Sequence, residues 1–125
     1  DSQGASTTYT QVTISNFVTN IETRMSASTA GVTYIGTKPI DVAITVNAGL
    51  DGIGGNTEEF DIAIYKNTQL ISGSERQLSL DTDEVGNINT FALANIVEND
   101  LITVYQKSPT NDDFTLFNYS IMIKE

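Results

Sequence analysis

The chain has 125 residues, of which 39% are hydrophobic, a composition that supports one self-sufficient core but contains no membrane-spanning run. Its sixteen acidic residues outnumber its six basic residues, and the net charge of −10 disfavours nucleic acid and anionic membranes as partners. Cysteine and histidine are both absent, which excludes disulfides, thiolate metal sites and the commonest general base. We therefore expect one acidic domain with no nucleic-acid partner and no membrane insertion.

The N-terminal part of the chain has the weakest pattern. Residues 1–8 are small and polar, and we predict that they are a linker or a disordered lead to a single domain over residues 9–125. Residues 9–17 alternate weakly and favour a strand. Residues 18–30 combine apolar residues at helical spacing with many Thr, Ser and Asn, so we predict irregular structure or a short strand there.

Residues 40–50 show the clearest pattern in the chain. Every even-numbered residue from Ile40 to Leu50 is apolar, whereas the odd-numbered residues between them are polar or small. Because side chains alternate between faces along a strand, this pattern predicts a long β-strand with one buried face. Pro39 precedes this strand, where a missing N–H group costs a sheet least. We expect the rest of the chain to supply partners for this strand.

Further strands follow at regular spacing. Apolar or alternating runs, separated by turns rich in Gly, Asn, Asp and Ser, occur at residues 32–35, 58–66, 70–71, 76–81, 88–97, 101–105 and 114–123. Eight or nine short strands at this spacing are typical of an antiparallel sandwich or barrel. We predict an all-β fold, specifically an antiparallel jelly-roll β-sandwich.

The last two predicted strands have apolar residues on both faces. An antiparallel sheet with one solvated face is expected to alternate cleanly instead. We therefore expect another copy of the chain to cover the outer face, because large apolar patches usually mark interaction sites. The candidate interface residues are Leu101, Tyr105, Phe114, Leu116 and Met122. The alternative is that a loop or the N-terminal segment of the same chain covers this face.

Three short motifs resemble a known family. Residues 34–40 show the pattern Tyr-x-Gly-Thr-x-Pro-Ile, residues 60–68 an alternating strand followed by Lys-Asn, and residues 99–104 the pattern Asn-Asp-x-Ile-x-Val. These motifs are similar to those of a domain at the C-termini of bacteriophage head and tail fibre proteins, although Thr68 stands where that family often has Gly. The resemblance covers about residues 32–123. It implies a trimeric jelly roll akin to the C1q and tumour-necrosis-factor fold on a virion, with no shared catalytic or ligand-binding residues to transfer.

One acidic turn is a candidate for metal binding. Residues 81–86 begin like an EF-hand loop, but Val85 and Ala92 stand at the fifth and twelfth positions, where that loop needs oxygen ligands. An EF-hand is therefore excluded. A looser calcium site formed by Asp81, Asp83 and Glu84 remains as an alternative to a solvated turn.

The remaining carboxylates do not predict an enzyme. Pairs of carboxylates occur at residues 58–61 and 112–113, and glycosidases use such pairs. The chain has no Trp to line a sugar-binding cleft, and the usual nucleophile–base pairs need a His or Cys that is missing. We therefore expect no enzymatic activity and no cofactor.

These observations predict a structural and binding domain. We expect a homotrimeric head domain of a viral fibre or spike, on the virion surface or otherwise extracellular, that contacts a host-surface receptor or glycan. Loops on a rigid scaffold are where binding residues usually lie. The candidate contacts in the loops at residues 51–57, 81–87 and 108–113 are Asp51, Asn56, Asn87, Asn111 and Asp112.

Two alternatives stay open. The first is a monomeric secreted carbohydrate-binding module, for which Tyr65 and Tyr105 are the only candidate sugar-stacking residues. The second is a purely architectural domain that decorates a capsid and recognises no ligand.

Overall fold

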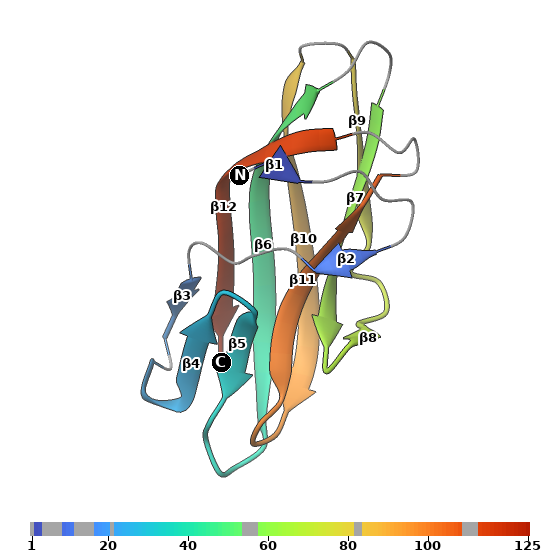
Figure 1. Cartoon of the computed structure of the whole chain (residues 1–125). Helices are drawn as coiled ribbons and strands as arrows, with labels where there is room; N and C mark the ends of the chain where they lie inside the picture. The colour runs from blue at the N-terminus through green and yellow to red at the C-terminus, as the bar shows by residue number, and fades with distance from the viewer. Residues whose placement is uncertain are drawn as a thin grey trace.

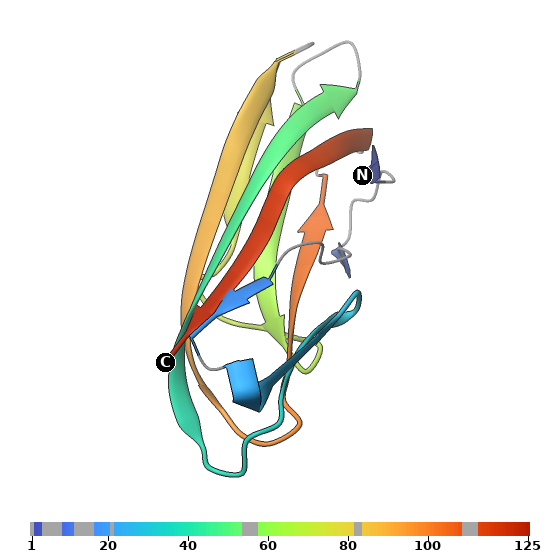
Figure 2. The ribbon, with the colours of Figure 1, turned by 90° about the vertical axis from the view of Figure 1, so that its left-hand side faces the viewer.

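The computed structural model describes residues 2–3, 9–11, 17–20, 22–53, 58–81, 84–108 and 113–125. Within these residues the chain forms two β-sheets that pack face to face, and the only helical element is a three-residue 3-10 helix, Glu22–Arg24 (Figure 1). The edge-on view in Figure 2 shows the two layers, with β10, β6 and β12 on one side and β11 on the other. The part of the chain described here includes no helix that is long and apolar enough to cross a membrane.

The β6 sheet contains five strands. They are β1 (Ser2–Gln3), β3 (Phe17–Thr19), β6 (Ile40–Ile53), β10 (Val85–Ile96) and β12 (Asp113–Lys124). Their order is β1–β12–β6–β10, and β3 also pairs with β12. All pairs in this sheet are antiparallel except β3–β12, which is parallel. The long strand β6 therefore lies in the centre, with β10 on one side and β12 on the other.

The β7 sheet contains seven strands. They are β2 (Thr10–Gln11), β4 (Met25–Ser28), β5 (Gly31–Tyr34), β7 (Glu58–Lys66), β8 (Gln69–Leu70), β9 (Arg76–Leu80) and β11 (Leu101–Lys107). Their order is β4–β5–β11–β7–β8, with β2 paired to β11 and β9 paired to β7. Every pair in this sheet is antiparallel.

The strand order is that of a jelly roll. Eight strands give the orders β3–β12–β6–β10 and β5–β11–β7–β9, and the chain changes sheet after each of them except between β7 and β9, which pair with each other. The short strands β1, β2, β4 and β8 extend these two sheets at their edges, which accounts for more strands than the eight or nine expected. The predicted fold class, an antiparallel jelly-roll β-sandwich, is confirmed.

The core lies between the sheets and is centred on β6. All even-numbered residues from Ile40 to Leu50 are buried, as the alternation predicted, with exposed fractions between 0% and 8%. From the facing β7 sheet, Phe60, Ile62, Ile64, Ile102 and Val104 complete the core. Burying each large apolar side chain contributes about 1.5–3 kcal/mol, so β6 alone supplies a large share of the driving force for folding.

Some element boundaries differ from the expected ones. Strand β6 continues to Ile53 and β10 already begins at Val85, because these two ends pair with each other through Asp51 and Val85. Within the expected N-terminal lead, Ser2–Gln3 forms a strand that pairs with β12. Two residues of the predicted linker or disordered lead are therefore part of the sheet, and the lead is not entirely separate from the domain.

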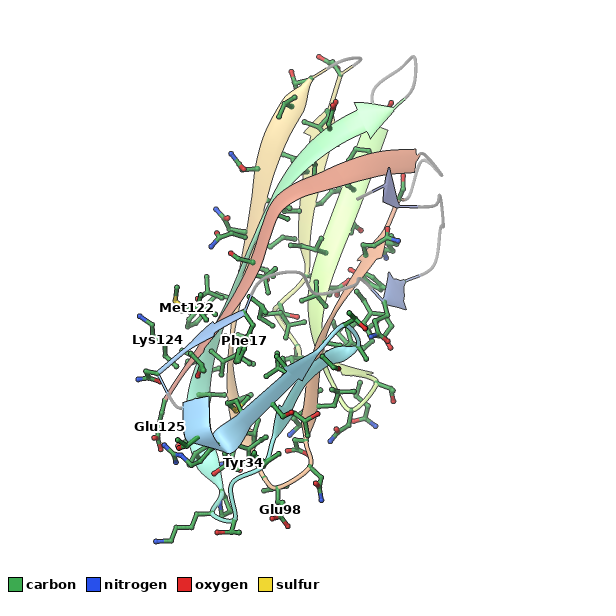
Figure 3. All side chains as sticks on the ribbon, turned by 60° about the vertical axis from the view of Figure 1, so that its left-hand side comes forward. Phe17, Tyr34, Glu98, Met122, Lys124 and Glu125 are labelled. Atoms are coloured by element: carbon green, nitrogen blue, oxygen red, sulfur yellow. The ribbon has the colours of Figure 1, made fainter. Side chains whose placement is uncertain are left out.

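The Tyr-x-Gly motif forms a tight corner between β5 and β6. The buried Tyr34 hydroxyl donates a hydrogen bond of 2.5 Å to the backbone oxygen of Lys38. Gly36 packs directly on the Tyr34 ring, because a Cβ atom at Gly36 would lie 2.5 Å from Cζ of that ring. The motif thus closes this end of the sandwich, where Figure 3 shows Tyr34 near the base of the molecule.

The other two motifs meet at this same end. Asn67 Nδ2 donates to Asp100 Oδ1 at 2.6 Å, and the Leu101 backbone N–H donates to Asn67 Oδ1 at 2.8 Å. Asp100 Oδ2 also accepts from the Val97 backbone N–H at 2.9 Å. In the turn between β10 and β11, the backbone N–H of Asn99 donates to Tyr34 O, and the backbone N–H of Tyr34 donates to Asp100 O. The three motifs therefore have structural roles in this chain, because their hydrogen bonds join three loops at one end of the sandwich.

Candidate functional site

The outer face of the β6 sheet presents the odd-numbered residues of β6 and β10, whose even-numbered neighbours largely point into the core. Strand register arranges these side chains in rows. One row across four strands contains Val18, Met122, Thr45 and Phe91, and the next contains Lys124, Ala43 and Leu93. We refer to Val18, Ala43, Thr45, Phe91, Leu93 and Met122 as the apolar band.

The apolar band is accessible to solvent in the single chain. Exposed fractions are 44% for Val18, 48% for Phe91 and 70% for Leu93, and Met122 is partly buried. A hollow of about 490 Å³ lies beside Leu93 and is lined partly by Ala43 and Ala94. The band therefore combines protruding apolar side chains with an adjacent depression, a shape that suits a packed protein partner.

Polar residues border the apolar band on both sides. The row toward the loops contains Ser120, Asn47 and Asn89, and the row on the other side contains Asp41 and Asn95. Asn95 Nδ2 donates to Asp41 Oδ1 at 2.9 Å. An apolar centre with a polar border is the usual anatomy of a protein–protein interface.

Charges near the band are few. Lys124 lies in its second row and is exposed, and Figure 3 shows Met122 and Lys124 on the outer side of the sandwich. The neighbouring Glu125 forms an ion pair of 2.7 Å with Arg24. This hydrogen bond raises the pKa of the Arg24 guanidinium above its ordinary value. The Arg24–Glu125 ion pair connects the residue after β12 to the 3-10 helix.

The outer face of the β7 sheet is different, because the N-terminal segment covers part of it. The rings of Tyr65 and Tyr105 stack with centroids 4.0 Å apart, and Tyr9 meets Tyr65 edge-on at 5.8 Å. The Tyr9 hydroxyl donates to Glu75 Oε2 at 2.8 Å, and Lys107 Nζ lies 4.5 Å from the centre of the Tyr9 ring. Each of the two stacked tyrosines thus covers one face of the other ring.

This tyrosine cluster shifts two ionisation equilibria. Burial, followed by the hydrogen bond to Glu75, raises the pKa of the Tyr9 phenol above its ordinary value. Burial also raises the pKa of Tyr65. On the same strand as Tyr65, Asp61 is largely buried. Its Oδ2 atom lies 3.8 Å from Lys107 Nζ, and the two side chains form an ion pair.

The described residues that flank the predicted ligand loops lie at one end of the sandwich, opposite the Tyr34 corner. Register places Asp51 beside both Val85 and Thr115, and Glu58 beside Leu80. Asp51 and Asn87 themselves lie in strands β6 and β10 and not in loops, because their backbones are paired. The other ligand candidates, Asn56, Asn111 and Asp112, lie outside the described residues.

The loose calcium site is only partly described. Asp81 and Glu84 are exposed on either side of the β9–β10 turn, where the Glu84 backbone N–H donates to the Asp81 oxygen at 3.0 Å. The third candidate, Asp83, lies outside the described residues. The calcium site stays a prediction.

The five predicted interface residues do not form one patch. Leu101 and Tyr105 lie on β11 in the β7 sheet, where Tyr105 is covered by Tyr65, whereas Met122 lies on β12 in the β6 sheet. Only the backbone of β12 is described at Phe114 and Leu116. A register irregularity between Phe117 and Ser120 places Leu116 opposite the inward Leu50 but Met122 opposite the outward Thr45. Alternation along the sequence therefore does not run unbroken through this strand.

Sequence reasoning did not single out the most exposed members of the apolar band. Phe91 and Leu93 alternate with Ala92 and Ala94, and the larger pair would ordinarily be assigned to the core. The structure buries Ala92 instead, because β10 pairs with β6 in a register that places Ile88, Ala92 and Ile96 inward. The feature of the sequence that could have identified Phe91 and Leu93 was their alternation with alanine in this strand.

Comparison with known proteins does not assign the chain to a family. No family model matches the chain, and no curated protein matches it. One solved structure with detectable similarity is a "Family 16 Carbohydrate Binding Module-2", with 14% sequence identity and a TM-score of 0.30 over 76% of this chain and 77% of that chain. A likeness of this degree supports no conclusion about what the present chain binds.

Proposed function

We propose that this chain is a non-enzymatic head domain that assembles as a homotrimer on a viral fibre or spike and presents its loop end to a host-surface ligand. The observation that carries the proposal is the apolar band, which crosses four strands on the outer face of a jelly-roll sheet. A monomer rarely leaves so continuous a band of Phe, Leu, Val and Met side chains in water. A second and third copy of the chain would cover it.

The energetics favour assembly through this band. Phe91 and Leu93 keep roughly half or more of their surface exposed in the single chain. Covering each of them contributes about 1–2 kcal/mol, a part of the value for complete burial of such a side chain. Because the net charge of −10 opposes self-association, the contact has to lie where acidic residues are scarce, and the band contains none.

Trimerisation would also serve binding at the loop end. Three weak sites held together bind a multivalent surface far more tightly than one site does. The strand residues that flank the three loops lie at one end of each sandwich, so a trimer with parallel long axes would direct these ends the same way. Receptor and glycan recognition remain part of the proposal, as does the location on a virion.

The mass of the domain in solution is the first test. Light scattering on the purified wild type is expected to give about 40 kDa, three times the 13.5 kDa of one chain. Thr45→Glu places a carboxylate in the middle of the apolar band and is expected to reduce the mass to that of one chain. Ser79→Glu, on the exposed side of β9, is the matched control and is expected to leave the mass unchanged.

The binding step needs a separate measurement. Fluorescently labelled wild type is applied to candidate host cells and to a glycan array, beside the Thr45→Glu variant. If the head domain binds through avidity, the variant is expected to bind about 100-fold or more weakly. A wild-type mass of 13.5 kDa contradicts the trimer. A trimer that adheres to no cell or glycan supports the architectural alternative.

A further inference from the structure

Strand β10 forms an edge of the β6 sheet and is open on one side. It pairs with β6 along its whole length, from Val85 to Ile96, and no other described strand pairs with it. Alternate residues of a strand direct their N–H and C=O groups to each side, so β10 presents a row of backbone donors and acceptors along its open side. Near the C-terminal end of β10, Lys66 Nζ donates a hydrogen bond of 3.2 Å to Asn95 O. Lys66 is the only side chain among the described residues that reaches a backbone oxygen at this end of the strand.

The sequence of β10 carries none of the features that usually protect an edge strand. Natural edge strands carry charges, proline or a bulge that prevents pairing with another chain. The sequence of β10, VGNINTFALANI, contains no charged residue and no proline, and its register with β6 is continuous. Its outward side chains include the exposed Val85, Phe91 and Leu93. A long edge strand without charges is a template for addition of another strand.

The charge distribution makes this edge a surface along which a second copy of this chain can approach. Two chains that each carry a charge of −10 repel one another over most of their surfaces. The strip formed by β10 and residues 42–50 of β6 contains no acidic residue, so two copies can approach along it without bringing like charges together. A twofold contact between identical strands is also the simplest closed arrangement for a homo-oligomer.

We propose that β10 pairs antiparallel with β10 of a second copy about a twofold axis at Asn89. The free part of the edge runs from Val85 to Leu93, because Lys66 already occupies the carbonyl of Asn95. Centring the pair on this segment places Asn89 opposite Asn89 of the second copy. It also places Val85 opposite Leu93, so that the two most exposed apolar side chains of the strand cover one another.

This contact goes beyond the proposed trimer. Strand pairing uses the backbone edge of β10 and involves only Leu93 of the apolar band, whereas the trimer covers the side chains of the whole band. If both contacts form, two trimers are joined. The two contacts therefore make separate predictions about cross-linking and mass.

A single cysteine tests the register directly, because the chain has no cysteine of its own. In Asn89→Cys the two introduced residues face each other with Cα atoms about 4.5–5.5 Å apart, within the range of a disulfide. Asn47→Cys is the matched control, since Asn47 is an exposed asparagine beside Asn89 on the next strand. In the proposed pair, two copies of residue 47 are separated by three strand spacings, about 14 Å, which a disulfide does not span.

Both variants are oxidised at micromolar concentration and examined on non-reducing gels, after circular dichroism has shown that each is folded. Asn89→Cys is expected to form a covalent dimer at least about tenfold faster than Asn47→Cys, because pairing raises the effective concentration of its thiols. Equal rates, faster reaction of Asn47→Cys, or no dimer from either variant overturns the proposal. Light scattering on the wild type measures the mass in solution and so tests the trimer separately.

The two readouts distinguish the proposals. A wild-type mass of about 40 kDa without cross-linking at position 89 retains the trimer, at three times 13.5 kDa, and rejects strand pairing. A mass of about 27 kDa, twice that of one chain, with cross-linking at position 89 retains strand pairing and rejects the trimer.

Discussion

Substituting Gly36 by Ala tests the structural account of the Tyr34 corner. The added Cβ would lie 2.5 Å from Cζ and 2.7 Å from Cε1 of Tyr34 and would also collide with its hydroxyl oxygen. The Tyr34 ring is completely buried, so it has no free space into which to move. Overpacking of this kind costs about 1–3 kcal/mol, and the rigid surroundings of the ring place our expectation near 2 kcal/mol.

Thermal and urea unfolding followed by far-UV circular dichroism measure this effect, because the chain has no Trp to serve as a fluorescence probe. A loss of about 2 kcal/mol lowers the melting temperature of a domain of this size by about 6–10 °C. Thr37→Ala, at the exposed neighbouring position, is the control and is expected to stay within about 0.5 kcal/mol of wild type. All samples are compared at one protein concentration, since assembly would itself add stability.

A double-mutant cycle locates the cause. Tyr34→Phe alone removes the hydrogen bond to Lys38 O and is expected to cost about 1 kcal/mol. In the Tyr34→Phe background, Gly36→Ala is expected to cost less than in wild type, because the collision with the hydroxyl oxygen is gone. If Gly36→Ala changes the free energy of unfolding by less than about 0.5 kcal/mol, the tight packing of the corner is refuted.

Three further predictions concern other polar groups. Ser74→Ala is expected to lower the free energy of unfolding by about 1–3 kcal/mol, measured by urea unfolding, because the buried hydroxyl accepts from Ile64 N at 3.0 Å and donates to Ile71 O at 2.7 Å. Asp100→Ala is expected to cost a similar amount, and an unchanged urea midpoint would contradict the role of this carboxylate in joining the loops. The raised pKa of Tyr9 stabilises the folded state below pH 10, the ordinary value, and this stability is lost as the pH rises further, because the unfolded state then releases the proton first. Urea midpoints between pH 9 and 11 are therefore expected to fall more steeply for wild type than for Tyr9→Phe, and parallel curves would refute this.

The sequence alone was sufficient to predict the sandwich and its central strand. Strand β6 could be read residue by residue, because a period of two is a local property that needs no knowledge of the partner strands. The approximate location of the ligand loops also followed from glycine- and asparagine-rich turns, although pairing of Asp51 with Val85 moved the strand ends by a few residues.

The outer faces were harder to predict, because alternation divides a strand into two faces without saying which is buried. Leu101 and Tyr105 were expected at a contact between copies. Within the single chain Tyr105 stacks on Tyr65, and Tyr9, which is distant in sequence, contacts Tyr65 edge-on and lies beneath Lys107. The alternative in which the N-terminal segment covers an outer face thus holds for part of the β7 sheet.

The amino-acid sequence determined the all-β class, the strand β6 and its buried face, because each depends on the order of apolar and polar residues within one short segment. Only the tertiary structure decided that Phe91 and Leu93 face outward, and that they share an apolar band with Val18 and Met122. Which of these side chains face outward depends on strand register and on the register irregularity in β12. Register is fixed by the packing of the whole sandwich, since a shift of one residue would exchange every inward side chain for an outward one.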